Sequence, residues 1–311
     1  YHTMDGVSKT TNARIVQTDV SGTSTSSYLS DVFSGGVLYS MPVSETSNFG
    51  IGYDISFTDF TTTLYSPIIV THHIADHGNT VFGLSLKSTY AKDTRNRTLF
   101  AEDGVLASLA GEVFFGIEGA SYTTLMFKTE SNKSFILKTF GFDWPTVLQA
   151  KTTLGIGAGL FGTTSLPFYN KYFAGGSGSV RGFKGSSLGP LTYNAPRAEN
   201  TCAAKQVPGK FIECDAVGGD FLSTAQFNWI FSPPAFLGED ARALRTTLFF
   251  DIGNVFEKVN DFEYNELRAS YGIEFNVLTP IGGVTVGFVD TLKSKEGDDT
   301  QPIVFQLGGN F

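Results

Sequence analysis

Residues 267–279 read LRASYGIEFNVLT, a stretch in which hydrophobic side chains alternate with small or polar ones. Successive side chains of a β-strand point to opposite faces, so this pattern predicts a strand with one apolar face and one polar face. The apolar face comprises Ala269, Tyr271, Ile273, Phe275 and Val277, and the polar face comprises Ser270, Gly272, Glu274 and Asn276.

The same alternation recurs in about twelve segments, each about 11 to 16 residues long. Strands of soluble proteins usually have about 5 or 6 residues, whereas a strand that crosses a bilayer at a tilt needs about 9 to 11. Short turns and long polar loops alternate between the segments, as they do in transmembrane barrels. The predicted strands are 8–20, 28–43, 49–61, 80–93, 105–117, 121–137, 146–160, 220–232, 244–256, 266–279, 283–293 and 301–311.

The sequence therefore predicts an all-β fold, a transmembrane antiparallel β-barrel with about 12 strands in this chain. A soluble β-sandwich would explain the alternation but not the strand lengths or the low charge: 17% of the 311 residues are charged, against roughly 25% in ordinary proteins. The net charge of −8 and the lack of a basic stripe argue against nucleic-acid binding. No run of about 20 mainly apolar residues exists, which excludes a helical membrane protein.

The longest connection, at about residues 161–219, carries the most informative motifs. Loops longer than about 15 residues are usually functional or disordered. The glycines of this loop match a dinucleotide fingerprint poorly and no helix is predicted after them, so no cofactor is expected. Cys202 and Cys214 lie in the same loop and favour a local disulfide in an oxidising compartment over two free thiols.

Two motifs in this loop resemble loop six of the BamA family of outer-membrane assembly factors, whose relatives include TamA and the two-partner-secretion transporters. They are Phe173-Ala174-Gly175-Gly176 and Val180-Arg181-Gly182-Phe183. Further landmarks follow in family order, namely Asp5-Gly6, Asp93, Arg95, Phe100, Asp103-Gly104, 215–219, 249–253, Pro280 and Gly282. The end of the chain, with Phe305, Leu307 and Phe311, resembles the C-terminal recognition signal of outer-membrane barrels.

The resemblance implies a location in the outer membrane of a Gram-negative bacterium. The family barrel has sixteen strands and is preceded by periplasmic POTRA domains. Residues 1–311 are accordingly expected to form a single β-barrel domain that lacks the POTRA domains and the first four family strands. Loop six, at about 161–219, is expected to fold into the lumen.

Arg181 is expected to find its partner inside that lumen, where a partly desolvated guanidinium needs a planar carboxylate. Asp251 lies on the same strand face as Gly253, which we expect to point inward. The strand with Gln226 and Asn228 lacks the carboxylate that some relatives use, which leaves Asp251 as the main candidate. The alternative is that both charges simply line a water-filled pore.

A metal site and catalytic chemistry are both disfavoured. His72, His73, Asp76 and His77 are residue types that bind zinc, but they fall in a predicted loop where a solvated surface explains them better. The remaining histidine, His2, lies in a predicted turn, so no Ser/His/Asp arrangement is supported and an enzyme is not expected.

The function implied by the resemblance is the folding and insertion of other β-barrel proteins. A lateral seam of the barrel would pair with a client strand by β-augmentation. The implied partners are unfolded outer-membrane protein clients, accessory lipoproteins, the lipid bilayer and lipopolysaccharide. Two alternatives stay open: a polypeptide-secreting transporter of the TamA or two-partner-secretion type, and a passive diffusion porin.

Overall fold

Twelve antiparallel strands form one sheet in the computed structural model of the chain, in the order β1 to β7 followed by β10 to β14. The structure describes residues 7–19, 28–62, 66–98, 100–139, 142–193, 214–231, 244–279, 282–295 and 297–307. The strands are β1 (Ser8–Asp19), β2 (Tyr28–Ser44), β3 (Ser47–Thr62), β4 (Thr80–Asp93), β5 (Gly104–Glu118), β6 (Ser121–Thr139), β7 (Phe142–Leu160), β10 (Phe221–Phe231), β11 (Leu244–Phe256), β12 (Arg268–Thr279), β13 (Gly282–Lys293) and β14 (Ile303–Leu307).

Each of these strands coincides with a segment predicted from alternation, and most ends agree within a few residues. The largest difference lies at the start of β7, which begins at Phe142 rather than at residue 146; β14 begins at Ile303 rather than at residue 301 and is described to Leu307. Two short strands, β8 (Leu191–Tyr193) and β9 (Cys214–Ala216), pair with each other inside the long connection between β7 and β10.

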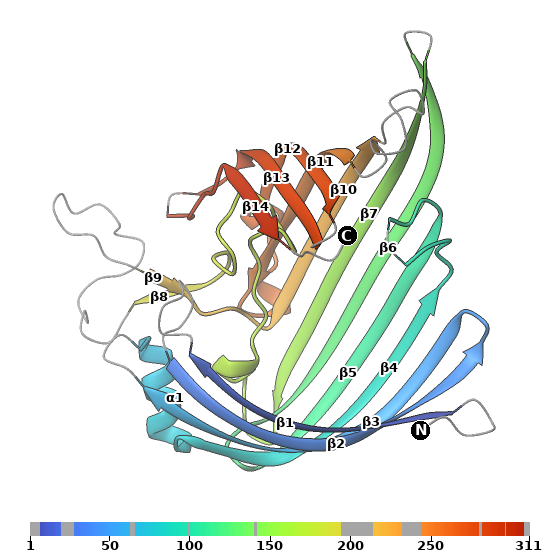
Figure 1. Cartoon of the computed structure of the whole chain (residues 1–311). Coiled ribbons are helices and arrows are strands. Elements are labelled where there is room, and N and C mark those ends of the chain that lie inside the picture. The colour runs from blue at the N-terminus through green and yellow to red at the C-terminus, as the bar shows by residue number, and fades with distance from the viewer. Residues whose placement is uncertain are drawn as a thin grey trace, which may run out of the picture.

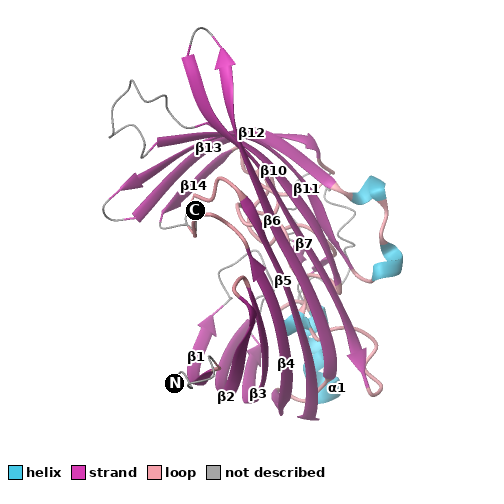
Figure 2. Cartoon of the chain, turned by 90° about the vertical axis from the view of Figure 1, so that its right-hand side faces the viewer, coloured by secondary structure: helices cyan, strands magenta, loops and turns pink. Residues whose placement is uncertain are grey.

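The sheet curls around a concave interior but stays open, with β1 and β14 as its two borders (Figures 1 and 2). Within the described residues, neither of these strands has a second neighbour in the sheet. Each border strand therefore presents one row of backbone N–H and C=O groups that no strand in this part of the chain satisfies.

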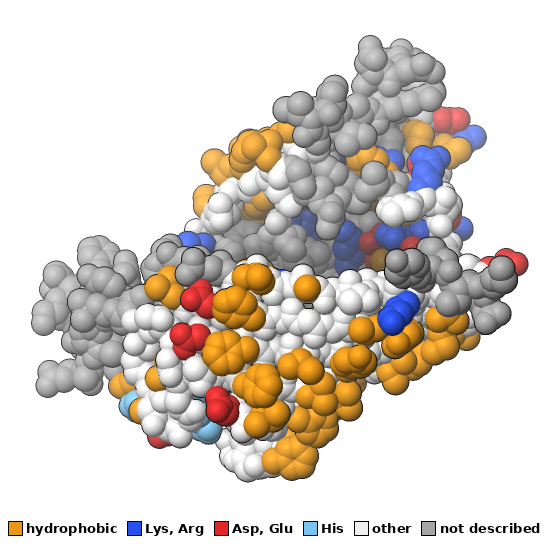
Figure 3. Space-filling view, turned by 60° about the horizontal axis from the view of Figure 1, so that its bottom comes forward, with side chains coloured by type: hydrophobic (Ala, Val, Ile, Leu, Met, Phe, Trp, Pro, Cys, Tyr) orange, Lys and Arg blue, Asp and Glu red, His pale blue; other side chains and the backbone are white. Residues whose placement is uncertain are grey.

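The two faces of the sheet differ as the alternation predicted. Phe227 and Tyr271 are about half exposed on the convex face, whereas Asp251 and Glu274 are buried on the concave face. Figure 3 shows hydrophobic side chains gathered over the convex surface. A convex apolar face and a concave polar face are the arrangement of a barrel whose outside meets lipid.

One α-helix, α1 (Ile68–His77), lies between β3 and β4, where the sequence predicted a polar loop. Helices shorter than about 12 to 15 residues are marginal by themselves and depend on tertiary packing, which explains why no helical pattern was visible. Here the buried Val70 supplies that packing, and the helix ends at Gly78, whose φ is +83°. No helix in the described part of the chain is long and apolar enough to cross a membrane.

The hydrophobic core lies between the concave face of the sheet and the long connection between β7 and β10. Its buried residues come from the sheet, from α1 and from this connection, loop six. From the strands it takes Phe60, Val81, Phe114, Tyr122, Leu222 and Val255, and from loop six Leu166, Phe168, Tyr172, Ala174, Val180, Phe183 and Leu188. The interior of the curved sheet is thus filled by loop six.

Leu109 and Ala110, neighbours in the middle of β5, test the assignment of the two faces. Leu109 is exposed on the convex face, and Ala110 lies on the concave face with an exposed side chain. Leu109→Arg is expected to lower the free energy of unfolding by about 2–4 kcal/mol, because it places a charge in the bilayer. Ala110→Arg reaches the lumen and is expected to cost much less.

The measurement is equilibrium unfolding by urea in lipid vesicles, with the two variants compared at one depth of the membrane. Equal losses for Leu109→Arg and Ala110→Arg would contradict the assignment of the faces.

Candidate functional site

Loop six enters the concave side of the sheet directly after β7 and returns to it at β10 (Figure 1). Backbone pairing holds the base of the loop together, with bridges between Tyr172 and Gly219 and between Ala174 and Leu188. The β8–β9 pair continues this closure. The described part of the loop is therefore a folded unit inside the sheet, as expected for a loop that enters the lumen.

The tip of loop six is a tight turn that depends on glycine. Gly175, Gly176 and Gly182 have φ values of +110°, +86° and +85°, which side chains rarely tolerate. A Cβ atom at Gly175 would lie 2.4 Å from the carbonyl oxygen of Lys184, and one at Gly182 would lie 2.7 Å from Cγ1 of Val289. The glycines of the two motifs thus shape the turn that presents Arg181.

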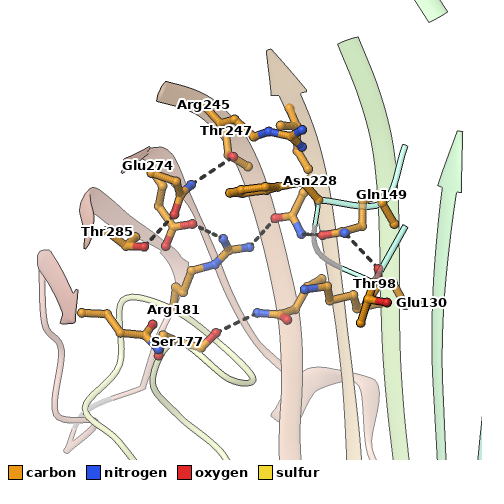
Figure 4. Close-up of a pocket in the computed structure, with 17 residues that line it drawn as sticks. Thr98, Glu130, Gln149, Ser177, Arg181, Asn228, Arg245, Thr247, Glu274 and Thr285 are labelled. Carbon is orange, nitrogen blue, oxygen red and sulfur yellow. Dashed lines mark hydrogen bonds and ion pairs between the residues drawn. The ribbon is translucent and has the colours of Figure 1, made fainter. Parts of the chain in front are cut away.

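Arg181 uses its whole guanidinium to bind the concave face of β10, β11 and β12. Nε and Nη2 donate to the two carboxylate oxygens of Asp251, each at 2.7 Å, and the backbone N–H of Arg181 donates to Oδ2 of Asp251 at 2.9 Å. Nη1 donates to Oε2 of Glu274 at 2.7 Å, and Nη2 also donates to Oδ1 of Asn228 at 2.6 Å. Figure 4 shows the guanidinium between Glu274 and Asn228.

The site is dry enough for these bonds to be strong. The Arg181 side chain is 6% exposed and that of Asp251 is fully buried. Charge-assisted bidentate bonds of this kind are about twice as strong as neutral ones. Burial alone would lower the pKa of the Arg181 guanidinium, but the hydrogen bonds and charges of Asp251 and Glu274 raise it overall, so the group stays protonated.

The expected pair of Arg181 and Asp251 is in contact, but three other contacts were not foreseen. Glu274 was placed on the polar face of its strand but was not assigned to the arginine, and Asn228 was considered only because its strand lacks a carboxylate. The third is the ring of Phe249, whose centroid lies 3.6 Å from Cζ of Arg181. A sequence signal existed for this ring, because Phe249 alternates onto the same strand face as Asp251. The structure adds that Gly272 lies opposite Phe249, where a Cβ would come within 2.8 Å of the ring.

A polar cavity of about 140 Å³ adjoins Arg181 on the concave side. Its lining includes Glu130, Lys151, Gln226 and Glu274, together with Phe100 from the connection between β4 and β5. A cavity of this size and polarity has room for water molecules. The arginine thus lies between the packed core of loop six and a polar cavity in the lumen.

A second contact region fixes the start of loop six to the other half of the sheet. The short helix η1 (Phe168–Asn170) places the Phe168 ring 5.0 Å from that of Tyr28 on β2 and 5.1 Å from that of Phe60 on β3. His73 on α1 lies 5.2 Å from Phe168. We call these four residues the aromatic anchor.

Within the histidine cluster, only His73 belongs to this packing, whereas His72, Asp76 and His77 are exposed as expected of a solvated surface; the segment is a helix rather than the predicted loop. Because α1 is a helix, His73 and His77 lie on one face and their rings stack at 4.6 Å. Burial, followed by the nearby His77, lowers the pKa of His73 to about 4, although Asp76 acts in the opposite direction. In the part of the chain that the structure describes, no three or more His, Cys, Asp or Glu side chains are placed to hold a metal ion.

Most of the other predicted site residues lie in the part of the chain that the structure describes, and two of them do not. Val180 and Phe183 are fully buried, Ala174 is buried and Phe173 is half-buried. Phe305 and Leu307 are exposed on β14. Phe311 and Cys202 lie outside the described residues, so the C-terminal signal at Phe311 and the disulfide between Cys202 and Cys214 stay predictions.

Removal of the Asp251 carboxylate is expected to release the tip of loop six. Asp251→Ala leaves the buried guanidinium short of its bidentate partner, which costs about 3–5 kcal/mol for a buried pair. Glu274→Gln removes one of the charged bonds and is expected to cost less. Amide hydrogen exchange of residues 173–188 measures the release.

Asp290→Asn is the matched control, because Asp290 is a carboxylate on β13 that points outward to the Tyr271 hydroxyl at 3.1 Å. Unchanged protection of residues 173–188 in Asp251→Ala would contradict a tether through this carboxylate.

The aromatic anchor is expected to weaken in acid. His73 has a pKa of about 4 in the folded protein and about 6.5 when unfolded, so the unfolded chain binds more protons between these values. The stability that the neutral ring contributes is complete above about pH 6.5 and is lost as the pH falls towards 4. Hydrogen exchange of residues 166–172 should therefore speed up over this range in the wild type.

His73→Gln should abolish that dependence, and His72→Gln should keep it, because His72 is exposed on the same helix. The same pH dependence in wild type and His73→Gln would rule out His73 as its source.

The comparisons with known proteins agree with this geometry. The Omp85 superfamily domain model matches residues 1–311. The chain is 26% identical over 349 residues to the outer membrane protein assembly factor BamA of Neisseria meningitidis serogroup B, covering 100% of this chain and 40% of that protein. It is also similar to the crystal structure of BamA from Haemophilus ducreyi lacking POTRA domains 1–3, with a TM-score of 0.81 and 21% identity over 98% of this chain and 59% of that one.

The chain therefore spans about 40% of the length of the curated relative that it matches. The predicted resemblance to BamA, the transmembrane β-barrel fold class and the location in the bacterial outer membrane are confirmed. The chain belongs to the Omp85 superfamily.

Proposed function

We propose that this chain is the membrane domain of a protein that folds and inserts other β-barrel proteins into the outer membrane. At the level of the superfamily, the role is insertion or secretion of polypeptides at that membrane. Insertion is the finer proposal. It requires no catalytic chemistry, only a barrel with an accessible strand edge and an interior that keeps its shape while the edge is in use.

The observation that carries the proposal is the buried contact of Arg181 with Asp251, Glu274 and Asn228. It joins the tip of loop six to three neighbouring strands at once. A loop that only connected β7 to β10 would not need a buried charge, because burying one costs several kcal/mol unless it is paired. The arginine therefore supports a loop whose position inside the lumen matters.

The border strand β14 supplies the second part of the proposal. Among the described strands, β14 pairs only with β13, so its other side can accept an incoming strand by β-augmentation. A client strand that pairs there would be aligned along the membrane normal by the existing strands. The proposed partners are unfolded outer-membrane protein clients, brought by accessory lipoproteins, in a bilayer that contains lipopolysaccharide.

The packing of loop six favours insertion at an edge over passage through the lumen. Val180, Phe183 and Leu188 are fully buried inside the curved sheet, so a polypeptide or solute that crossed the interior would have to displace them. Secretion and passive diffusion both need that displacement. Pairing at an edge does not.

Arg181→Ala is expected to lower the yield of folded outer-membrane barrels, because the tip of loop six loses its contacts with β10, β11 and β12. Arg181→Lys should rescue poorly, since an ammonium group cannot make the planar bidentate contact with Asp251. The measurement is the amount of heat-modifiable barrel protein in cells that depend on the variant, at matched levels of the variant itself. Asp290→Asn serves as the control carboxylate substitution.

Normal barrel assembly by Arg181→Ala at normal protein level would contradict the proposal. Ion conductance or polypeptide export that rises in Arg181→Ala while barrel assembly is unchanged would favour the transporter or porin instead.

A further inference from the structure

The tip of loop six also forms backbone hydrogen bonds with the connection between β13 and β14, through the residues that directly follow Arg181. Phe183 and Thr300 form an antiparallel bridge. The backbone N–H of Lys184 donates to the carbonyl oxygen of Asp299 and that of Gln301 donates to the carbonyl oxygen of Gly182, both at 2.8 Å. Since β14 begins at Ile303, the segment that pairs with loop six leads directly into the edge strand.

Side-chain packing reinforces this backbone contact. Phe183 is buried, with 1% of its surface exposed, and Gly182 lies so close to Val289 on β13 that a Cβ there would clash. Val289 in turn donates its backbone N–H to the carbonyl oxygen of Pro302 at 2.8 Å. Residues 299–302 are thus held between loop six and β13.

A buried ion pair fixes the same segment from the side of β12. Nε of Arg268 donates to Oδ2 of Asp298 at 2.9 Å, and Nη2 donates to Oδ1 at 3.0 Å. The two side chains are 10% and 7% exposed, so this is not an ordinary surface salt bridge. Nη1 of Arg268 also donates to the carbonyl oxygen of Glu266 at 2.6 Å, and Lys295 pairs with the Glu266 carboxylate.

We infer that residues 297–302 are a positioning segment that sets the edge strand β14 relative to loop six, with Arg268 and Asp298 as the positioning residues. This inference rests on the proposed function, because it assumes that β14 is an edge at which clients pair. Arg181 holds the tip of loop six on β10 to β12, Gly182 and Phe183 hold residues 299–301, and these residues lead into β14. The contacts of Arg181 therefore help to hold β14 in place through this chain of neighbouring residues.

This positioning can be removed by two routes, through the backbone at Gln301 or through the ion pair of Asp298 and Arg268. Gln301→Pro deletes the N–H that binds Gly182, while Gln301→Ala keeps it and is the matched control, since the Gln301 side chain is exposed. Asp298→Asn keeps the shape of the side chain but weakens the bidentate contact with Arg268. Arg268→Lys should behave like Asp298→Asn because it loses the planar fork.

The first readout needs no client: amide hydrogen exchange of residues 303–307 in the native protein in lipid. Loss of one net hydrogen bond shifts an equilibrium by about fivefold, so exchange should rise by about that factor in Gln301→Pro and Asp298→Asn but not in Gln301→Ala. The thermal transition of the whole barrel should be unchanged, which separates local positioning from general damage.

The second readout is photocrosslinking to a fragment that carries the last strand of an outer-membrane porin. A photoreactive phenylalanine analogue is placed at position 305 on β14 or, as the control, at position 15 on β1. The yield of crosslinks from position 305 should fall by about fivefold in Gln301→Pro and Asp298→Asn, the same factor by which hydrogen exchange rises. The yield from position 15 should not change.

Unchanged exchange of residues 303–307 in both variants would overturn the inference, and so would an equal rise in Gln301→Ala. Raised exchange with unchanged crosslinks from position 305 would also overturn it, because β14 would then move without consequence for the client. In each case the effect of Arg181→Ala on barrel assembly tests the proposed function separately.

Discussion

The bidentate contact between Arg181 and Asp251 is the interaction on which the interior of this protein depends. A guanidinium that lost this contact would be left in a nearly dry site, where an unpaired charge is strongly unfavourable. The tip of loop six is therefore held where the arginine finds its carboxylates. Gly175, Gly176 and Gly182 adopt positive φ values that only a fixed turn would require.

Loop six bridges the two halves of an open sheet because it is anchored at two places. The aromatic anchor holds its start against β2, β3 and α1, and the arginine holds its tip against β10, β11 and β12. The two anchors differ in chemistry: one is non-directional packing and the other is a set of oriented charged bonds. Because loop six contacts both halves of the sheet, it holds them at a set distance and so helps to maintain the curvature of the sheet.

The guanidinium of Arg181 has two carboxylate partners, Asp251 on β11 and Glu274 on β12. Asn228 on β10 contributes only an amide oxygen, and the second carboxylate comes from β12 instead. Through Glu274 the arginine reaches β12, which only β13 separates from the edge strand β14. The contacts of Gly182 and Phe183 with residues 299–301 extend the same line of contacts to that edge.

The sequence by itself determined the all-β class, the strand positions and the face on which each side chain lies. An alternation of period two assigns faces without any knowledge of neighbours, which is why Asp251 and Glu274 were both expected in the lumen. It also marked Arg181 and Asp251 as a pair, through the resemblance of their motifs. It could not show that Glu274, 93 residues away, shares the guanidinium, because that depends on strand register and on the path of loop six.

Only the tertiary structure decided the remaining features. Helix α1 has too few residues to form without packing, so its sequence carried no helical signal, and His73 became a packing residue only through that helix. The pairing of loop six with residues 299–301 uses backbone groups, which leave no trace in side-chain patterns. The curvature that brings loop six between the two halves of the sheet likewise belongs to the tertiary structure, since a sequence pattern determines the direction of side chains but not the curvature of a sheet.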